Sequence, residues 1–200
     1  MSEFTLNEKL WQQGMTLSQY LESMQTNQIE LRHRLERIQL SSTEKDSLAK
    51  CHLVCHVAVL TEDWCSDSLM NLPILARMVE ALPAADLLIF PRPLWEGMNQ
   101  YFIQRGIRHI PVFWFLDGNF TELGVFEERS KAARERGEQW KIEHPEFDAV
   151  RGDPALSKEE KKTMLAPLLA QLKEENSRWY NQEGLQSATV AEILQLLQPY

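Results

Sequence analysis

The amino-acid sequence predicts an α/β domain, a central mixed β-sheet flanked by helices, with helical extensions at both ends of the chain. Three observations lead to this prediction. Apolar stretches alternate with helix-like segments in the middle of the chain, a turn signal joins the last two stretches, and polar helical segments lie outside them. Strands joined through helices pair in parallel by right-handed crossovers, whereas a tight turn pairs its strands antiparallel.

The first half of the sheet is predicted from two apolar runs, each followed by a helix. Residues 52–60 are dense in β-branched and apolar side chains, as in a buried strand, and residues 86–90 read as its parallel neighbour. Helices are predicted over residues 66–81 and 94–104. The first of them contains Pro73, which lacks a backbone donor and should kink the helix.

The second half of the sheet is predicted to be a hairpin. A strand that begins at Pro111 runs into the dipeptide Asp117-Gly118, and residues 120–127 supply the returning strand. Asp-Gly is among the turn sequences that two-residue hairpin connections prefer. This strand pair should therefore be antiparallel, which makes the whole sheet mixed.

The two ends of the chain are predicted to be helical. Residues 4–40 suggest helix in two pieces, with a capping box at Thr16 and Gln19, and a last helix is expected to begin at Thr189. We read these ends as extensions of one domain. The predicted boundaries are residues 1–45 for the N-terminal extension, 46–140 for the sheet domain and 141–200 for the C-terminal extension.

Composition narrows the classes of function. The 200 residues include 44% apolar and 25% charged side chains, as in an ordinary soluble globular protein, and the net charge of −8 disfavours nucleic-acid binding. The basic cluster Arg129–Arg136 is interleaved with glutamates and reads as a solvated helix face. We find no signal peptide and no apolar run long enough for a bilayer, and three uneven cysteines make no disulfide framework. We therefore expect a cytoplasmic protein with no membrane partner.

The stretch Trp64-Cys65-Ser-Asp-Ser68 carries most of the chemical information. It places Cys65 after the first predicted strand and at the start of a helix, where unpaired N–H groups and the helix dipole stabilise a thiolate. Asp67 lies in the same turn and competes electrostatically with a thiolate. The net direction of the shift in the Cys65 pKa is left open by these opposing effects.

These residues resemble the thioredoxin-like family. The family pattern is Trp-Cys-x-x-Cys with a proline eight residues past the first cysteine, which Trp64, Cys65 and Pro73 meet. The segment from Gly106 to Gly118, which reads Gly-Ile-Arg-His-Ile-Pro before an apolar strand, is similar to a second family motif. The resemblance covers roughly residues 45–130 and implies a thioredoxin fold.

The resemblance also implies a substrate site. It implies a cis peptide bond between Ile110 and Pro111, packed against Cys65, in a loop that pairs its backbone with an extended substrate. Trp64, His109, Ile110 and Pro111 are therefore the expected substrate-binding residues, and Cys65 and Ser68 are the expected catalytic pair.

Three departures from the family pattern limit the chemistry. Ser68 replaces the resolving cysteine; its hydroxyl can donate to a Cys65 thiolate but cannot attack a mixed disulfide. Val59 stands where the family often carries a buried carboxylate, so the usual proton acceptor for the resolving step is missing. His109 replaces a glycine common beside the cis-proline, and either lowers the Cys65 pKa, binds substrate, or is a plain surface side chain.

The other two cysteines are not expected to act with Cys65. Cys51 and Cys55 lie toward the far end of the first predicted strand, too distant for a disulfide with Cys65. Their spacing with His52 and His56 suggests zinc, but on a strand the two cysteines would be about 13 Å apart. We therefore predict no metal and no other cofactor.

Two functions remain, from different classes. The first is a monothiol thioredoxin-like protein, in which Cys65 attacks a protein or small-thiol disulfide and an external thiol releases the adduct. The alternative is a redox-inactive binding module that holds a partner peptide in a groove around Trp64, Ile110 and Pro111. The family's resolving cysteine and buried carboxylate are both missing, with Ser68 and Val59 in their places, and this loss favours the alternative. Retention of Cys65 favours the first function.

Overall fold

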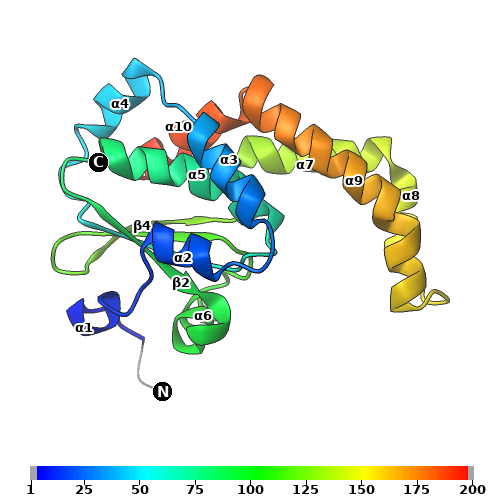
Figure 1. Ribbon diagram of the computed structural model, residues 1–200, viewed down its shortest axis with the longest axis horizontal. Coiled ribbons are helices and arrows are strands. Elements are labelled where there is room, and N and C mark those ends of the chain that lie inside the picture. The colour runs from blue at the N-terminus through cyan, green and yellow to red at the C-terminus, as the bar shows by residue number, and fades with distance from the viewer. Residues whose placement is uncertain (1–3, 198–200) are drawn as a thin grey trace. The chain divides into compact units, whose positions relative to one another are not determined.

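The computed structural model describes residues 4–197 and contains a four-stranded mixed sheet (Figure 1). The strand order is β2-β1-β3-β4; β1 and β2 are parallel, and the other neighbours are antiparallel. The fold is the thioredoxin fold with helical extensions, as the sequence predicts. The strands are β1 (His56–Thr61), β2 (Asp86–Pro91), β3 (Val112–Leu116) and β4 (Glu122–Glu127).

Helices precede, interrupt and follow these strands. In chain order they are α1 (Glu8–Trp11), α2 (Leu17–Ser23), α3 (Gln28–Arg37), α4 (Ser42–Leu48), α5 (Ser66–Ala81), the 3₁₀ helix η1 (Arg92–Leu94), α6 (Glu96–Gln104), α7 (Lys131–Glu143), α8 (Pro145–Gly152), α9 (Lys158–Gln182) and α10 (Leu185–Leu197).

Side chains alternate across the sheet and build a core on each face. Ala58, Leu60 and Trp114 belong to a cluster with Met98 and Phe102 of α6. The intervening strand residues point to the opposite face, where α5 lies, because successive side chains of a strand alternate. Figure 1 shows α5 and α6 on the two sides of the sheet. The helix that carries the Cys65 motif is thus buried along most of its length.

The N-terminal extension forms three helices before α4, not the two pieces expected. The chain turns at Gly14, where an added Cβ would lie 2.7 Å from the Phe90 ring, so only glycine fits this close approach. Met15 then pairs with Ile89 of β2. The capping box at Thr16 is confirmed, and it starts a separate helix, α2.

Three other predicted boundaries are wrong. The returning strand β4 begins at Glu122 rather than at residue 120, because the hairpin loop extends from Asp117 to Thr121 and has its positive φ, 61°, at Phe120. Residues 52–55 are not strand: backbone hydrogen bonds from Cys51 and His52 back to Leu48 and Lys50 close a turn after α4, and β1 begins at His56. The last helix begins at Leu185 rather than Thr189, directly after Gly184 with its positive φ of 86°.

The described chain divides into two compact units. One comprises residues 4–129 and 189–197 and contains the sheet; the other comprises residues 130–188 and contains α7, α8 and α9. In the second unit, Trp140 packs against Phe147 with ring centroids 5.4 Å apart, and α8 packs on α9. The boundaries 1–45, 46–140 and 141–200 stay a prediction. Within residues 4–197, no helix is both long and apolar enough to cross a membrane.

Candidate active site around Cys65

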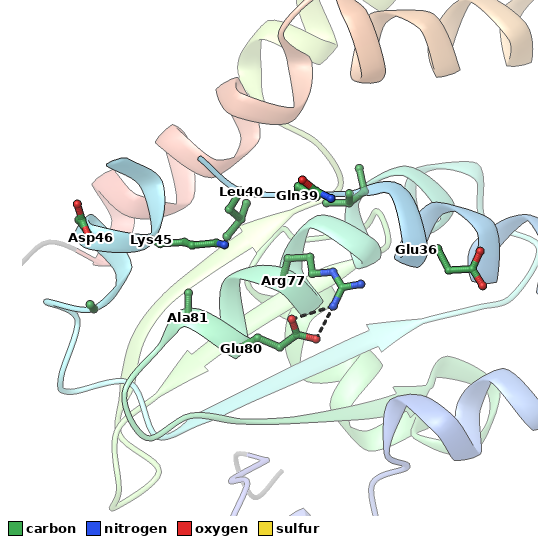
Figure 2. Close-up of a pocket in the computed structure, with 10 residues that line it drawn as sticks. Glu36, Gln39, Leu40, Lys45, Asp46, Arg77, Glu80 and Ala81 are labelled. Atoms are coloured by element: carbon green, nitrogen blue, oxygen red, sulfur yellow. Dashed lines mark hydrogen bonds and ion pairs between the residues drawn. The ribbon is translucent and has the colours of Figure 1, made fainter. Parts of the chain in front are cut away.

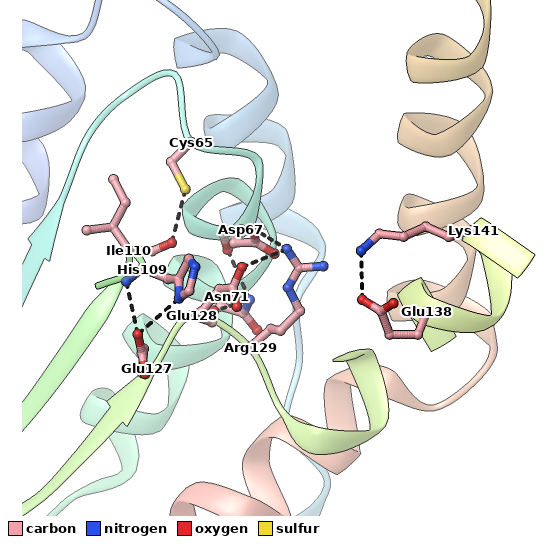
Figure 3. Close-up of polar contacts among 10 residues, drawn as sticks. All are labelled: Cys65, Asp67, Asn71, His109, Ile110, Glu127, Glu128, Arg129, Glu138 and Lys141. Carbon is pink, nitrogen blue, oxygen red and sulfur yellow. Dashed lines mark hydrogen bonds and ion pairs between the residues drawn. The ribbon is translucent and has the colours of Figure 1, made fainter. Parts of the chain in front are cut away.

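Cys65 is the N-cap residue of α5, as its motif predicts. Its carbonyl accepts the first helical hydrogen bond from Leu69, but its side chain caps no backbone N–H. The sulfur instead lies 3.3 Å from the carbonyl oxygen of Ile110, to which the thiol donates (Figure 3). The peptide bond between Ile110 and Pro111 is cis. The structure thus brings together three of the predicted site residues.

The thiol is buried, and its surroundings oppose ionisation. Cys65 is 7% exposed. Burial raises the pKa of Cys65, while hydrogen bonds from the Ser68 hydroxyl and N–H lower it, and the Asp67 charge raises it. Burial prevails, so the pKa of the Cys65 thiol lies above its ordinary value. The thiol is therefore protonated at neutral pH.

Ser68 lies one turn behind the sulfur and has a second partner. Its hydroxyl oxygen is 2.5 Å from the hydroxyl oxygen of Thr61, at the end of β1. Ser68 is 4% exposed and Thr61 is fully buried. Ser68 is thus the link between Cys65 and a polar group deeper in the protein.

A partly buried ion pair lies on the other side of Cys65. Arg129 Nη2 is 2.7 Å from Asp67 Oδ2 and 3.0 Å from Glu128 Oε1 (Figure 3). Burial raises the pKa of Asp67 to about 6; the Arg129 charge opposes this rise and the Glu128 charge adds to it. Asn71 donates to the carbonyls of Asp67 and Glu128, which ties α5 to the end of β4.

Sequence reasoning missed this ion pair. It assigned Arg129 to a solvated helix face, and this interpretation is wrong because α7 begins only at Lys131. Arg129 lies 62 residues from Asp67 in the chain, and only the pairing of β4 with β3 brings the two together. A basic residue directly after the last strand was the one available signal.

Glu127, the last residue of β4, holds the loop before the cis-proline. Its Oε1 accepts from the N–H groups of Arg108 at 2.8 Å and His109 at 2.9 Å. His109 is exposed, and its Nδ1 lies 3.2 Å from the same oxygen. The Pro111 carbonyl accepts from Glu128 N–H at 2.7 Å. The loop is therefore bound to β4, and the His109 ring is placed beside Glu127.

Trp64 covers the outer side of the motif. It is 56% exposed, its indole N–H donates to Glu62, and the Arg92 guanidinium lies 5.8 Å from its ring centroid. Glu62 also pairs with Arg92. Among the predicted substrate-binding residues, Ile110 and Pro111 are buried, whereas Trp64 and His109 are open to a partner.

Cys51 and Cys55 lie at the far end of β1 from Cys65, which is about 20 Å away along a six-residue strand. Cys51 donates to Ser47 and Cys55 to Leu53, both main-chain carbonyls. All three cysteines are free. Within the described ranges, no cluster of three or more His, Cys, Asp or Glu side chains could hold a metal.

A separate hollow of about 740 Å³ lies among α3, α4 and α5 (Figure 2). It is lined by mixed charges that include Lys45, Asp46 and Glu36. Arg77 points across it but pairs with Glu80 at 2.8 Å. None of the predicted site residues lines this hollow. The Cys65 region therefore remains the candidate active site.

Fold and site geometry together define a protein of the thioredoxin-fold class, with one cysteine at the start of α5 facing a cis-proline loop. A sequence model described as thioredoxin matches residues 14–141, more than half of the chain. The chain therefore belongs to the thioredoxin family. The match is wider than the segment 45–130 on which the resemblance rests.

Solved structures give the same fold. A protein of unknown function, PA1234 from Pseudomonas aeruginosa, has 19% identity and a TM-score of 0.62, with 98% of each chain covered. An HIV epitope scaffold of the 4E10 series has 18% identity and a TM-score of 0.61, with 94% of this chain and 95% of that chain covered. No curated protein matches the sequence.

Proposed function

We propose that the protein exchanges thiols and disulfides through one sulfur, that of Cys65. The observation that carries this proposal is the position of the Cys65 sulfur, at the N-cap of α5 and 3.3 Å from the Ile110 carbonyl beside the cis-proline. When a disulfide binds beside this carbonyl, the sulfur of Cys65 faces the disulfide, and the hydrogen bond that the thiol donates to the Ile110 carbonyl is lost. Protein disulfides and disulfides of small thiols are the substrate classes.

The exchange has two steps with one enzyme sulfur. The Cys65 thiolate attacks one sulfur of a disulfide, forms an enzyme–substrate disulfide, and releases the second sulfur as a thiolate that takes a proton from water. An external thiol, as its thiolate, then attacks the adduct. It leaves bonded to the substrate sulfur, and Cys65 is restored as a thiolate. Ser68 cannot perform this release because a hydroxyl does not attack a disulfide.

The reaction is expected to be faster at alkaline pH. Burial raises the pKa of Cys65, so the reactive thiolate is scarce at pH 7 and increases about tenfold per pH unit until the pKa is reached. We therefore expect adduct formation to rise steadily with pH, beyond the range in which an unperturbed thiol levels off.

The test is adduct formation with glutathione disulfide, followed by intact mass from pH 7 to pH 10. Wild-type protein should gain one glutathionyl group on Cys65, and added dithiothreitol should remove it. Cys65→Ala should lose this adduct, located by peptide mass, whereas Cys55→Ala, a matched control in the same unit that removes a more exposed thiol, should retain it. Absence of the adduct at pH 10, in protein whose Cys65 is still alkylated by iodoacetamide, contradicts the proposal.

A redox-inactive binding module is the second candidate, and the protonated thiol favours it. The Cys65 thiol donates to Ile110 and its pKa is raised by burial, which also suits a purely structural cysteine. In that case Cys65→Ala should retain partner binding, and Trp64→Ala, which removes an exposed ring, should weaken it at least tenfold. Under the exchange proposal, capture of a partner should instead depend on Cys65 and reverse with a reducing agent.

A further inference from the structure

A narrow cavity of about 10 Å³ lies behind Cys65, among α2, α3 and α5. Its lining includes Tyr20, Cys65 and Ser68. A space of this size holds at most one water molecule. Tyr20 is 3% exposed and comes from the N-terminal extension. A helix outside the predicted sheet domain therefore contributes a polar group to the site.

The buried Tyr20 hydroxyl needs a hydrogen-bond partner, and the Thr61 hydroxyl is its neighbour. Within residues 4–197 the Tyr20 hydroxyl makes no hydrogen bond of standard geometry, although it is buried. Burial raises the pKa of Tyr20, and the neighbouring Thr61 hydroxyl opposes this rise. The phenol therefore stays protonated at every working pH and is the stronger donor of the two hydroxyls. Thr61 is the neighbouring hydroxyl toward which this hydrogen can turn.

Once Thr61 accepts from Tyr20, the direction of the next bond follows. A hydroxyl has one hydrogen, and the Thr61 hydrogen is then available for Ser68, whose oxygen is 2.5 Å away. If Ser68 accepts it, the Ser68 hydrogen is free to turn toward the sulfur, whose pKa the Ser68 hydroxyl lowers. Hydrogen bonds in such a chain polarise one another, and burial strengthens each of them.

We propose that Tyr20 is a positioning residue for Cys65, acting through Thr61 and Ser68 so that the Ser68 hydroxyl donates to the sulfur. The three residues, which we call the hydroxyl line, stabilise the thiolate without any charged group. The proposal deepens the proposed function, because it rests on Cys65 as the reacting sulfur. It also gives the N-terminal extension a role in the chemistry of the site.

Charged groups also surround the line, and the test must separate their effects. They are Glu62 and Asp63, which follow β1, Asp67 on α5, and Arg129, which follows β4. The substitutions below change no charge. A change in the Cys65 titration therefore reports the hydrogen bonds rather than the electrostatics.

The experiment is the pH profile of iodoacetamide labelling of Cys65, measured by peptide mass spectrometry on folded protein. Tyr20→Phe should slow labelling at pH 7.5 about threefold, because the end of a cooperative chain is lost. Ser68→Ala should slow it about tenfold, because a hydrogen bond to a charged group is lost. Tyr101→Phe, the control, removes a tyrosine hydroxyl that accepts from Arg105, and should leave the profile unchanged.

A second pair of variants covers the case in which Tyr20→Phe does not fold. Thr61→Ser keeps the hydroxyl and should retain the wild-type profile, whereas Thr61→Val removes it and should match Tyr20→Phe. Tyr20→Phe combined with Thr61→Val should slow labelling no more than Thr61→Val alone. An unchanged profile in folded Tyr20→Phe, or in Thr61→Val, overturns the proposal.

The outcome is independent of disulfide exchange, because labelling needs no disulfide substrate. If Tyr20→Phe changes the labelling profile but the protein forms no glutathione adduct, the hydroxyl line is retained and the proposed function is rejected. If the glutathione adduct forms but Tyr20→Phe leaves the labelling profile unchanged, the proposed function is retained and the hydroxyl line is rejected.

Discussion

The two sides of Cys65 differ in how they act on its sulfur. On one side the hydroxyl line of Tyr20, Thr61 and Ser68 is neutral and almost completely buried. On the other side, Asp67 and its partner Arg129 are charged, and the Arg129 side chain is 29% exposed. The neutral side acts by hydrogen-bond donation, which solvent ions do not screen. The charged side acts over a distance and is sensitive to salt and pH.

The comparison explains why the thiol pKa is raised in a helix position that usually lowers it. A helix N-terminus and a hydroxyl donor both favour a thiolate. At Cys65 burial outweighs these effects, and the Asp67 carboxylate adds to burial. The site therefore keeps the geometry of a nucleophile while holding its proton at rest.

Among changes to the neutral side, replacing Ser68 by cysteine should have the largest effect on activity. The new thiol occupies the resolving position of the family motif, so an internal disulfide with Cys65 becomes possible. Wild-type protein should not reduce insulin with thioredoxin reductase, whereas Ser68→Cys should give measurable turnover. The combination Ser68→Cys with Cys65→Ala is the control and should be inactive.

A lack of turnover in folded Ser68→Cys would identify a second missing group. Val59 is buried at the position where the family often carries a carboxylate. Val59→Asp in the Ser68→Cys background should then restore the release step. Turnover by wild-type protein would contradict the monothiol assignment, since another cysteine would have to release Cys65.

Asp67→Asn should remove the effect of the charged side on the Cys65 thiol. Removing a carboxylate that raises the Cys65 pKa should speed iodoacetamide labelling at pH 7.5 about threefold to tenfold. Glu80→Gln is the matched control, because it removes an exposed acid from the other end of α5. Slower labelling in Asp67→Asn would show that Asp67 assists ionisation of the thiol, contrary to the comparison.

Asp67 should also affect the pH dependence of stability. Its pKa is raised from 3.8 to about 6, so the folded state favours the protonated carboxyl. The contribution is fully present below pH 3.8 and is lost as the pH rises through about 6. Wild-type protein should therefore lose about 2–3 kcal/mol of unfolding free energy relative to Asp67→Asn between pH 4 and pH 7. Urea unfolding at both pH values measures this difference; a constant gap between the variants would contradict it.

Local signals in the sequence predicted the fold and the position of the reacting sulfur. Pro73, the Asp117-Gly118 turn and the capping box at Thr16 each act within a few residues, so their patterns are readable without the fold. The start of β1 was predicted four residues early, because Leu53 and Val54 are apolar although they belong to a turn and its exit. Apolar content alone does not separate a strand from the segment that leads into it.

The surroundings of Cys65 depend on long-range contacts, which local patterns do not record. Tyr20 and Arg129 lie 45 and 64 residues from Cys65 in the chain, on opposite sides of it. Tyr20 fits the apolar face of an ordinary amphipathic helix, and Arg129 begins an ordinary charged stretch. Their roles follow only from the packing of α2 against α3 and β2 and from the end of β4. The direction of the Cys65 pKa shift depends on burial, which local sequence patterns also do not record.

The smallest predicted effect concerns Glu127, which holds the cis-proline loop from the charged side. Burial raises the Glu127 pKa, but the N–H groups of His109 and Arg108 outweigh burial, and the pKa lies below its ordinary value of 4.5. Glu127→Gln keeps an oxygen acceptor and should cost about 1 kcal/mol of unfolding free energy at pH 7. Because the pKa is lowered in the folded state, this cost should shrink as the pH falls through 4.5 and below. Glu127→Ala, which removes the acceptor, should cost about 2 kcal/mol and retain part of that cost at low pH. Equal costs for both variants at every pH would show that Glu127 holds the loop by packing alone.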